Sequence, residues 1–153
     1  MPEFIFWTPG LIDVKSNARY LHYRDRIQNG GSMRKTSDLI WQDTQHQVLF
    51  ELIEQIKIVP FDPAILDRLR LYAEHHFVLE ETYMQRLDYP HTEAHLEAHN
   101  RFREELEAMM ETDPTMHESL QISLSDFLHK WLKLHVLGID KQLEEFVLNS
   151  KHK

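Results

Sequence analysis

The sequence predicts an all-α protein, an up-down-up-down four-helix bundle preceded by an N-terminal arm. Apolar residues recur at helical spacing from Ser37 onward, short breaks rich in aspartate and proline separate these stretches, and no stretch alternates as a strand would. Because the breaks are short, consecutive helices should pack side by side in antiparallel order. At 153 residues the chain has the size of one domain and can bury a core.

Four helices are expected, and the breaks between them have a recognisable chemistry. Asp62-Pro63 places a capping aspartate before a first-turn proline, and Asp113-Pro114 repeats that pattern. Prolines also end the first helix and separate the second from the third. The expected helices run from Asp38 to about Lys57, from Asp62 to about Leu87, from about Pro90 to about Glu111, and from Asp113 to about Leu148.

Residues 1–36 are the predicted arm, to which the sequence assigns no function, and residues 37–150 are the predicted bundle. Within the arm, residues 17–27 could form a short helix, and residues 28–32 have the composition of a flexible link. Met33 follows Gly-Gly-Ser and is an alternative start of the native chain, with foreign or fused sequence before it. The chain could also be an excised module of a larger protein. Both alternatives stay open at the level of the sequence.

The residue types present limit the kinds of metal site that the protein can form. The chain has no cysteine, which excludes disulfides, thiolate zinc sites and cysteine-ligated iron–sulfur clusters. Any metal must therefore be held by imidazole and carboxylate, ligands that suit iron, zinc, copper or manganese. Eleven histidines is a high number for this length and is the feature of the composition that most needs an explanation.

Charge and hydropathy exclude two classes of partner. A net charge of −8 argues against nucleic acid, because phosphate backbones attract basic surfaces. No apolar stretch could span a bilayer, and the apolar segment beginning at Phe4 stops at Pro9-Gly10 without the pattern of a signal peptide. We therefore expect a cytoplasmic protein whose partners include neither nucleic acid nor a membrane.

Five histidines and two carboxylates are distributed over the four predicted helices. They are His46; His76 with Glu80; His95 with His99; and His135 with Asp140. Residues four apart on a helix are offset by only about 40°, so two of these pairs share a face. His135 and Asp140 are five apart, about 140° round a regular helix, so a shared metal requires long side-chain reach or local distortion. Gly138 between them would ease such a distortion.

The number and type of these groups fit two metal ions better than one. Five imidazoles, two bridging carboxylates and one oxo or hydroxo bridge fill about eleven of the roughly twelve positions of two octahedral ions. The open position could bind one small molecule. Singly, each fragment occurs by chance, but here every predicted helix contributes, and burial of so many polar groups without a metal would be costly.

The chain resembles a hemerythrin, most nearly of the bacterial type, from about Asp38 to Leu148. The matching segments are Asp43-x-Gln45-His46, His76-Phe77-x-x-Glu80-Glu81, Tyr89-Pro90 with His95-x-x-x-His99-x-x-Phe102, and Trp131-Leu132-x-x-His135-x-x-x-x-Asp140. All seven ligand positions of that family are present in order. The resemblance therefore implies a non-haem site of two iron ions with an oxo or hydroxo bridge and dioxygen as its ligand.

The resemblance also implies a role for each of these residues. One iron would be held by His95, His99 and His135, and the other by His46 and His76. Glu80 and Asp140 would bridge the two, and dioxygen would bind at the iron with two histidines. The residues that match the family's apolar oxygen pocket are Leu49, Phe77, Trp131 and Leu132.

The remaining histidines and Glu81 are expected to lie outside the site. His75 precedes a proposed ligand by one position, about 100° round the helix, and should be exposed; Glu81 should face away from Glu80 for the same reason. His91 lies one turn before His95 and should be at the surface. The histidines without a partner at metal spacing are His22, His117, His129 and His152.

Three functions compete at this level. The first is reversible dioxygen binding, as a carrier or store or as an oxygen- or redox-sensing module that signals to an output domain or a partner protein. The second is a di-iron enzyme, an oxidase, peroxidase or nitric oxide-processing protein; five histidines against two carboxylates disfavour it, because ferritin-like oxidases have carboxylate-rich sites. The third is a structural bundle with incidental zinc.

Overall fold

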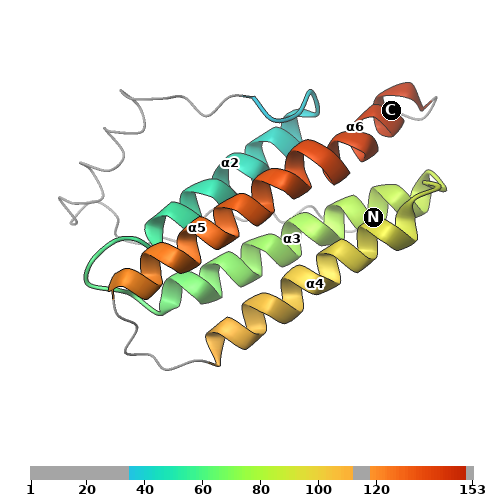
Figure 1. Ribbon diagram of the computed structural model, residues 1–153. Coiled ribbons are helices and arrows are strands. Elements are labelled where there is room, and N and C mark those ends of the chain that lie inside the picture. The colour runs from blue at the N-terminus through green and yellow to red at the C-terminus, as the bar shows by residue number, and fades with distance from the viewer. Residues whose placement is uncertain (1–34, 112–117, 151–153) are drawn as a thin grey trace, which may run out of the picture. The chain divides into compact units, whose positions relative to one another are not determined.

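The computed structural model describes residues 35–111 and 118–150, and every regular element within those two ranges is a helix. In chain order the elements are α2 (Ile40–Gln55), α3 (Ala64–Arg86), α4 (Thr92–Met110), α5 (Glu118–Leu134), the π-helix η2 (His135–Ile139) and α6 (Asp140–Asn149). Because α5, η2 and α6 continue one another, the bundle has four rods (Figure 1). The predicted fold class is confirmed. The predicted break at Asp113-Pro114 lies outside the described residues.

Helix α3 begins and ends close to the residues that the sequence predicted as its limits. Asp62 accepts a backbone N–H of the first turn through Oδ1 at 3.0 Å, and Pro63 has a helical φ of −56°. At the other end Asp88 has a left-handed φ of 50°, which a short polar side chain tolerates. This conformation lets the Tyr89 N–H donate to the Met84 carbonyl at 2.9 Å, as in a Schellman motif.

The apolar core lies between the rods and is closed at one end by a separate cluster. Helix α2 packs against α3 and α5, and α3 packs against α4. The cluster joins α3, the loop after it and α6, through the side chains of Met84, Tyr89, Leu143 and Val147. Fully burying a large apolar side chain stabilises the fold by about 1.5–3 kcal/mol. The buried apolar side chains of the bundle can therefore offset the cost of burying a polar centre. Among the described helices, none combines the length and apolar character needed to cross a bilayer.

The fourth rod changes from α- to π-helical hydrogen bonding at the proposed ligands. The Asp140 N–H donates to the His135 carbonyl, a bond across five residues that admits one extra residue into the turn. The wider turn lets both side chains enter the bundle, where His135 is 3% exposed and Asp140 is fully buried. The local distortion that the five-residue spacing required is therefore a π turn.

Replacing Gly138, inside this turn, by alanine is expected to raise the stability slightly and to leave metal binding intact. A Cβ added there meets nothing within 4 Å, and alanine loses less backbone entropy on folding than glycine, so the gain should be about 0.5–1 kcal/mol. Thermal unfolding and metal content of Gly138→Ala and the unaltered protein test this. A lower melting temperature or a lost metal ion would instead support the predicted role of Gly138 in easing the distortion.

Candidate metal centre

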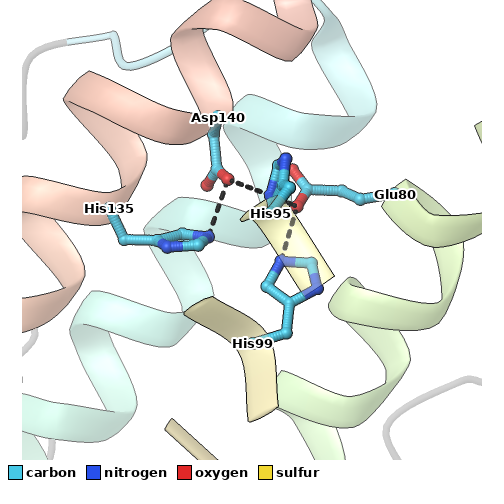
Figure 2. A group of neighbouring side chains, drawn as sticks. All are labelled: Glu80, His95, His99, His135 and Asp140. Atoms are coloured by element: carbon cyan, nitrogen blue, oxygen red, sulfur yellow. Dashed lines mark ion pairs between the residues drawn. The ribbon is translucent and has the colours of Figure 1, made fainter. Parts of the chain in front are cut away.

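All seven side chains singled out by the sequence meet inside the bundle. None of them is more than 3% exposed, although each is polar or ionisable. They come from every rod: His46 from α2, His76 and Glu80 from α3, His95 and His99 from α4, and His135 and Asp140 from η2 and α6. Figure 2 shows five of them converging from three rods on a common point.

The seven side chains form two ligand groups that share their carboxylates. One group contains three histidines, His95, His99 and His135, and the other contains His46 and His76. Glu80 and Asp140 belong to both, and in each group the potential ligand atoms lie within 4.8 Å of one another. We call these the three-histidine group and the two-histidine group. The division matches the one that the family resemblance implied; the role of each residue as a ligand stays a prediction.

Glu80 directs one oxygen toward each group. Its Oε2 lies 3.2 Å from Nε2 of His95 and 3.2 Å from Nε2 of His99. Its Oε1 lies 3.5 Å from Nε2 of His76, in the two-histidine group. This is the arrangement that a carboxylate needs to bridge two cations.

Asp140 divides its oxygens in the same way. Its Oδ1 lies 3.1 Å from Nε2 of His95 and 2.8 Å from Nε2 of His135. Its Oδ2 lies 3.1 Å from Nε2 of His46 and 3.8 Å from Nε2 of His76. Both carboxylates therefore link the two groups, and all five imidazoles present Nε2 to the interior.

The unsatisfied polar atoms at this centre fit a cation. Within the described part of the chain, all five Nε2 atoms, Oε2 of Glu80 and both oxygens of Asp140 are buried without a hydrogen-bond partner. Each orphaned group of this kind normally costs about 1–3 kcal/mol, and more when charged. Unprotonated Nε2 and carboxylate oxygen both direct lone pairs at one shared space, where metal ions would satisfy all of them. The donor set, imidazole and carboxylate without thiolate, suits iron.

The electrostatics of the centre also require positive charge between the carboxylates. Burial and the neighbouring Asp140 both raise the pKa of Glu80, but the positive charge of His76 and the close imidazoles of His95 and His99 hold it at about 2. Burial lowers the pKa of His95, yet the close carboxylates of Asp140 and Glu80 raise it to about 9. Both pKa shifts have the same cause, two buried carboxylates that favour positive charge beside them, and a bound metal ion would bring that charge.

The outer nitrogen of His46 is fixed by a residue ahead of the first helix. Nδ1 of His46 lies 2.9 Å from Oγ1 of Thr36, whose hydroxyl donates to Oδ1 of Asp43 at 2.9 Å. A hydroxyl that donates to a carboxylate accepts from the imidazole, so Nδ1 carries the hydrogen and Nε2 is free to bind metal. Thr36 was predicted to be part of the arm, whereas the compact unit of the bundle starts at Lys35.

Two glutamines of α2 form hydrogen bonds with the candidate ligands of α3. Oε1 of Gln45 lies 2.9 Å from Nδ1 of His76, and Nε2 of Gln42 donates to Oε1 of Glu80 at 2.6 Å. The Ser37 hydroxyl in turn donates to Oε1 of Gln42 at 2.7 Å. The polar side chains that α2 buries beside His46 therefore have a physical role, because they orient His76 and Glu80 on the neighbouring helix.

A carboxylate from outside the three-histidine group contacts one of its imidazoles. Oε1 of Glu81 is 3.0 Å from Nδ1 of His99 and 3.0 Å from Nη2 of Arg103. The sequence predicted that Glu81 would face away from Glu80 and lie outside the site, although the family motif includes Glu81. The contact joins residues eighteen apart on different helices, and no spacing within one helix could have indicated it.

The predicted oxygen pocket is apolar and mostly buried. Leu49, Phe77 and Leu132 are each 1% exposed, and Trp131 is half-buried. Phe77 stacks on His99 with ring centroids 4.0 Å apart, and Trp131 stacks on His135 at 4.9 Å. The two aromatic rings therefore cover imidazoles of the three-histidine group, and the role of these four residues around dioxygen stays a prediction.

The other described histidines lie away from the centre. His75 and His91 are exposed, and His129 lies 3.2 Å from Oε1 of Glu54. His22, His117 and His152 lie outside the described residues. Within the described ranges, the two groups above are the clusters of three or more histidine or carboxylate side chains able to hold a metal.

Comparison with known proteins identifies the family of the chain. The family model of the hemerythrin HHE cation-binding domain matches residues 39–147, a stretch that contains all seven side chains. The match covers more than half of the chain, and the protein belongs to this family. No curated protein matches the chain closely. The buried histidine, glutamate and aspartate side chains thus form a cluster able to bind metal, of the kind that supports a non-haem iron site.

Proposed function

We propose that the protein binds dioxygen reversibly at a non-haem di-iron centre. The observation that carries this proposal is the unequal division of ligands, three histidines in one group and two in the other, with Glu80 and Asp140 shared. His95, His99 and His135 would hold one iron, and His46 and His76 the other. When bound, the reduced iron pair would supply the two electrons that reversible dioxygen binding requires, and its hydroxo bridge the proton.

The chain's own residues would orient the ligands and exclude water. Hydrogen bonds at Nδ1 fix which nitrogen of His46, His76 and His99 faces inward. Near-complete burial keeps solvent from the centre, and the apolar side chains of Leu49 and Leu132 would limit the entry of water and protons, which promote irreversible oxidation. The two-histidine group offers one protein ligand fewer than the three-histidine group, so its side of the centre would leave room for dioxygen.

Oxygen uptake by the iron-loaded, reduced protein tests the proposal. An oxygen electrode should record uptake of one dioxygen per two irons, and flushing with argon should release it. Continued consumption of dioxygen, exceeding this ratio, would instead show an oxidase. Uptake without release would point to a redox sensor or to simple oxidation.

Leu132→Ala is expected to speed the oxidation of the iron centre to the ferric state. The side chain is 1% exposed, one turn before His135, and its truncation would open space through which water can reach the site. The ferric absorbance, followed in air, should rise faster than in the unaltered protein. Leu69→Ala, at a fully buried position two turns from His76, controls for general loosening of the core. Equal rates in the two variants would count against Leu132 as a barrier.

The choice between a carrier, a store and a sensor depends on the effect of dioxygen binding on the rest of the protein. We propose sensing on equal terms with carriage, with an output domain or a partner protein as the recipient of the signal. The test is a comparison of the oxygenated and oxygen-free forms by hydrogen exchange. Changed protection beyond the residues around the centre would favour sensing, and changes limited to the centre would favour carriage or storage.

A further inference from the structure

The three imidazoles whose outer nitrogens have partners differ in what they contact. His46 donates to a hydroxyl, that of Thr36, and His76 donates to an amide oxygen, that of Gln45. His99 alone among these three contacts a carboxylate directly, that of Glu81. The charged partner therefore belongs to the three-histidine group and the neutral ones to the two-histidine group.

The Glu81 carboxylate is held in place rather than free to turn away. Nη2 of Arg103 lies 3.0 Å from its Oε1, and the same guanidinium binds Glu74 through two nitrogens at 2.7 Å and 3.1 Å. The guanidinium also lies over the Phe77 ring, 5.2 Å from its centroid, and that ring stacks on His99. Arg103 thus fixes both the carboxylate and the ring that contact this one imidazole.

A carboxylate at Nδ1 changes the imidazole as a ligand. It draws the Nδ1 hydrogen toward itself, raises the basicity of Nε2, and so strengthens electron donation to a metal. Stronger donation favours the higher charge state of that metal over the lower one. Neutral acceptors such as those of His46 and His76 have a weaker effect.

We propose that Glu81, held by Arg103, is a positioning residue that makes the metal of the three-histidine group the more readily oxidised of the two. The proposal rests on the dinuclear centre proposed above and deepens it, because it assigns unequal redox properties to the two ions. It gives a function to a carboxylate that does not contact the metal-facing nitrogens.

The test is Glu81→Gln in the iron-loaded protein, with the whole chain present. Glutamine keeps the length and an oxygen that can accept from His99, and removes the charge. In a spectroelectrochemical titration, one of the two one-electron steps should move to a more positive potential and the other should stay within error. Glu74→Gln is the matched control, since it removes the same charge from the same arginine without touching His99. It should leave both steps unchanged.

A second measurement covers the case in which the variant holds iron poorly. Metal-free Glu81→Gln is titrated with cobalt(II), and the affinity of one of the two ions should fall by about 10–100-fold. Equal potentials and equal cobalt affinities in Glu81→Gln and the unaltered protein would overturn the proposal, as would equal shifts of both steps. If the unaltered protein binds fewer than two ions, the dinuclear centre itself fails, and the two failures are thereby distinguished.

Discussion

Asp140→Ala is expected to lower the iron content from two ions per chain to one or none. Its two oxygens approach four imidazoles, in both ligand groups. Removing them would delete one of the two bridging carboxylates, and with it one ligand of each ion. Glu80→Ala should act in the same way, because its oxygens are divided similarly. Losing a side chain that binds only one ion would lower the iron content less than losing one that both ions share.

Iron analysis of the purified, reconstituted variants measures this effect. Asp126→Ala is a suitable control, because this aspartate is exposed and pairs with Lys57 at 3.0 Å, away from the centre. The control should retain two irons per chain. Nearly two irons per chain in Asp140→Ala or Glu80→Ala would rule out the bridging assignment. That result would not contradict the four-helix bundle.

Removing the metal is expected to destabilise the whole bundle. Without it, the centre holds buried carboxylates and imidazoles, and within the described chain all their inward atoms except Oε1 of Glu80 lack a hydrogen-bond partner. Ligand binding to the folded state alone stabilises by about 4 kcal/mol at a thousandfold excess over the dissociation constant. For a domain of this size that corresponds to a rise in melting temperature of roughly 8–16 °C.

Thermal unfolding followed by circular dichroism, under anaerobic conditions with and without iron(II), measures this rise. Asp140→Ala should show a much smaller response, since it cannot hold both ions. Identical melting temperatures for the metal-free and iron-loaded protein would mean that the buried polar groups are compensated in some other way.

Much of the centre could be predicted because its geometry is helical. A spacing of four residues places His76 with Glu80, and His95 with His99, on one face of a helix wherever that helix packs. The aspartate-proline pair at the start of α3 likewise acts through local hydrogen bonds. Such features depend on residues that are close in the sequence, so they can be predicted from the sequence alone.

The spacing of His135 and Asp140 sets regular helix geometry against the need for a shared site. A regular α-helix would separate the two side chains, while a shared site required them together. The sequence therefore predicted that the helix is distorted there, but not which kind of distortion it contains. The structure resolves the conflict by one π turn, which brings both side chains into the bundle without ending the rod.

The contacts around the candidate ligands could not be predicted, for a different physical reason. Thr36 lies in the segment ahead of α2, where no periodicity exists, and reaches His46 only after the chain has folded back. Glu81 meets His99 across two helices. Contacts of this kind result from the packing of helices against one another, which sequence spacing does not encode.

The most direct test of the di-iron proposal is the visible absorption spectrum of the iron-loaded protein, reduced without air and then exposed to dioxygen. The proposal predicts a charge-transfer band that appears with dioxygen, fades when dioxygen is removed, and returns in a second cycle. Direct passage to a stable ferric spectrum would contradict reversible binding and favour a redox sensor or an enzyme. A protein that stays colourless after reconstitution would contradict the iron centre itself.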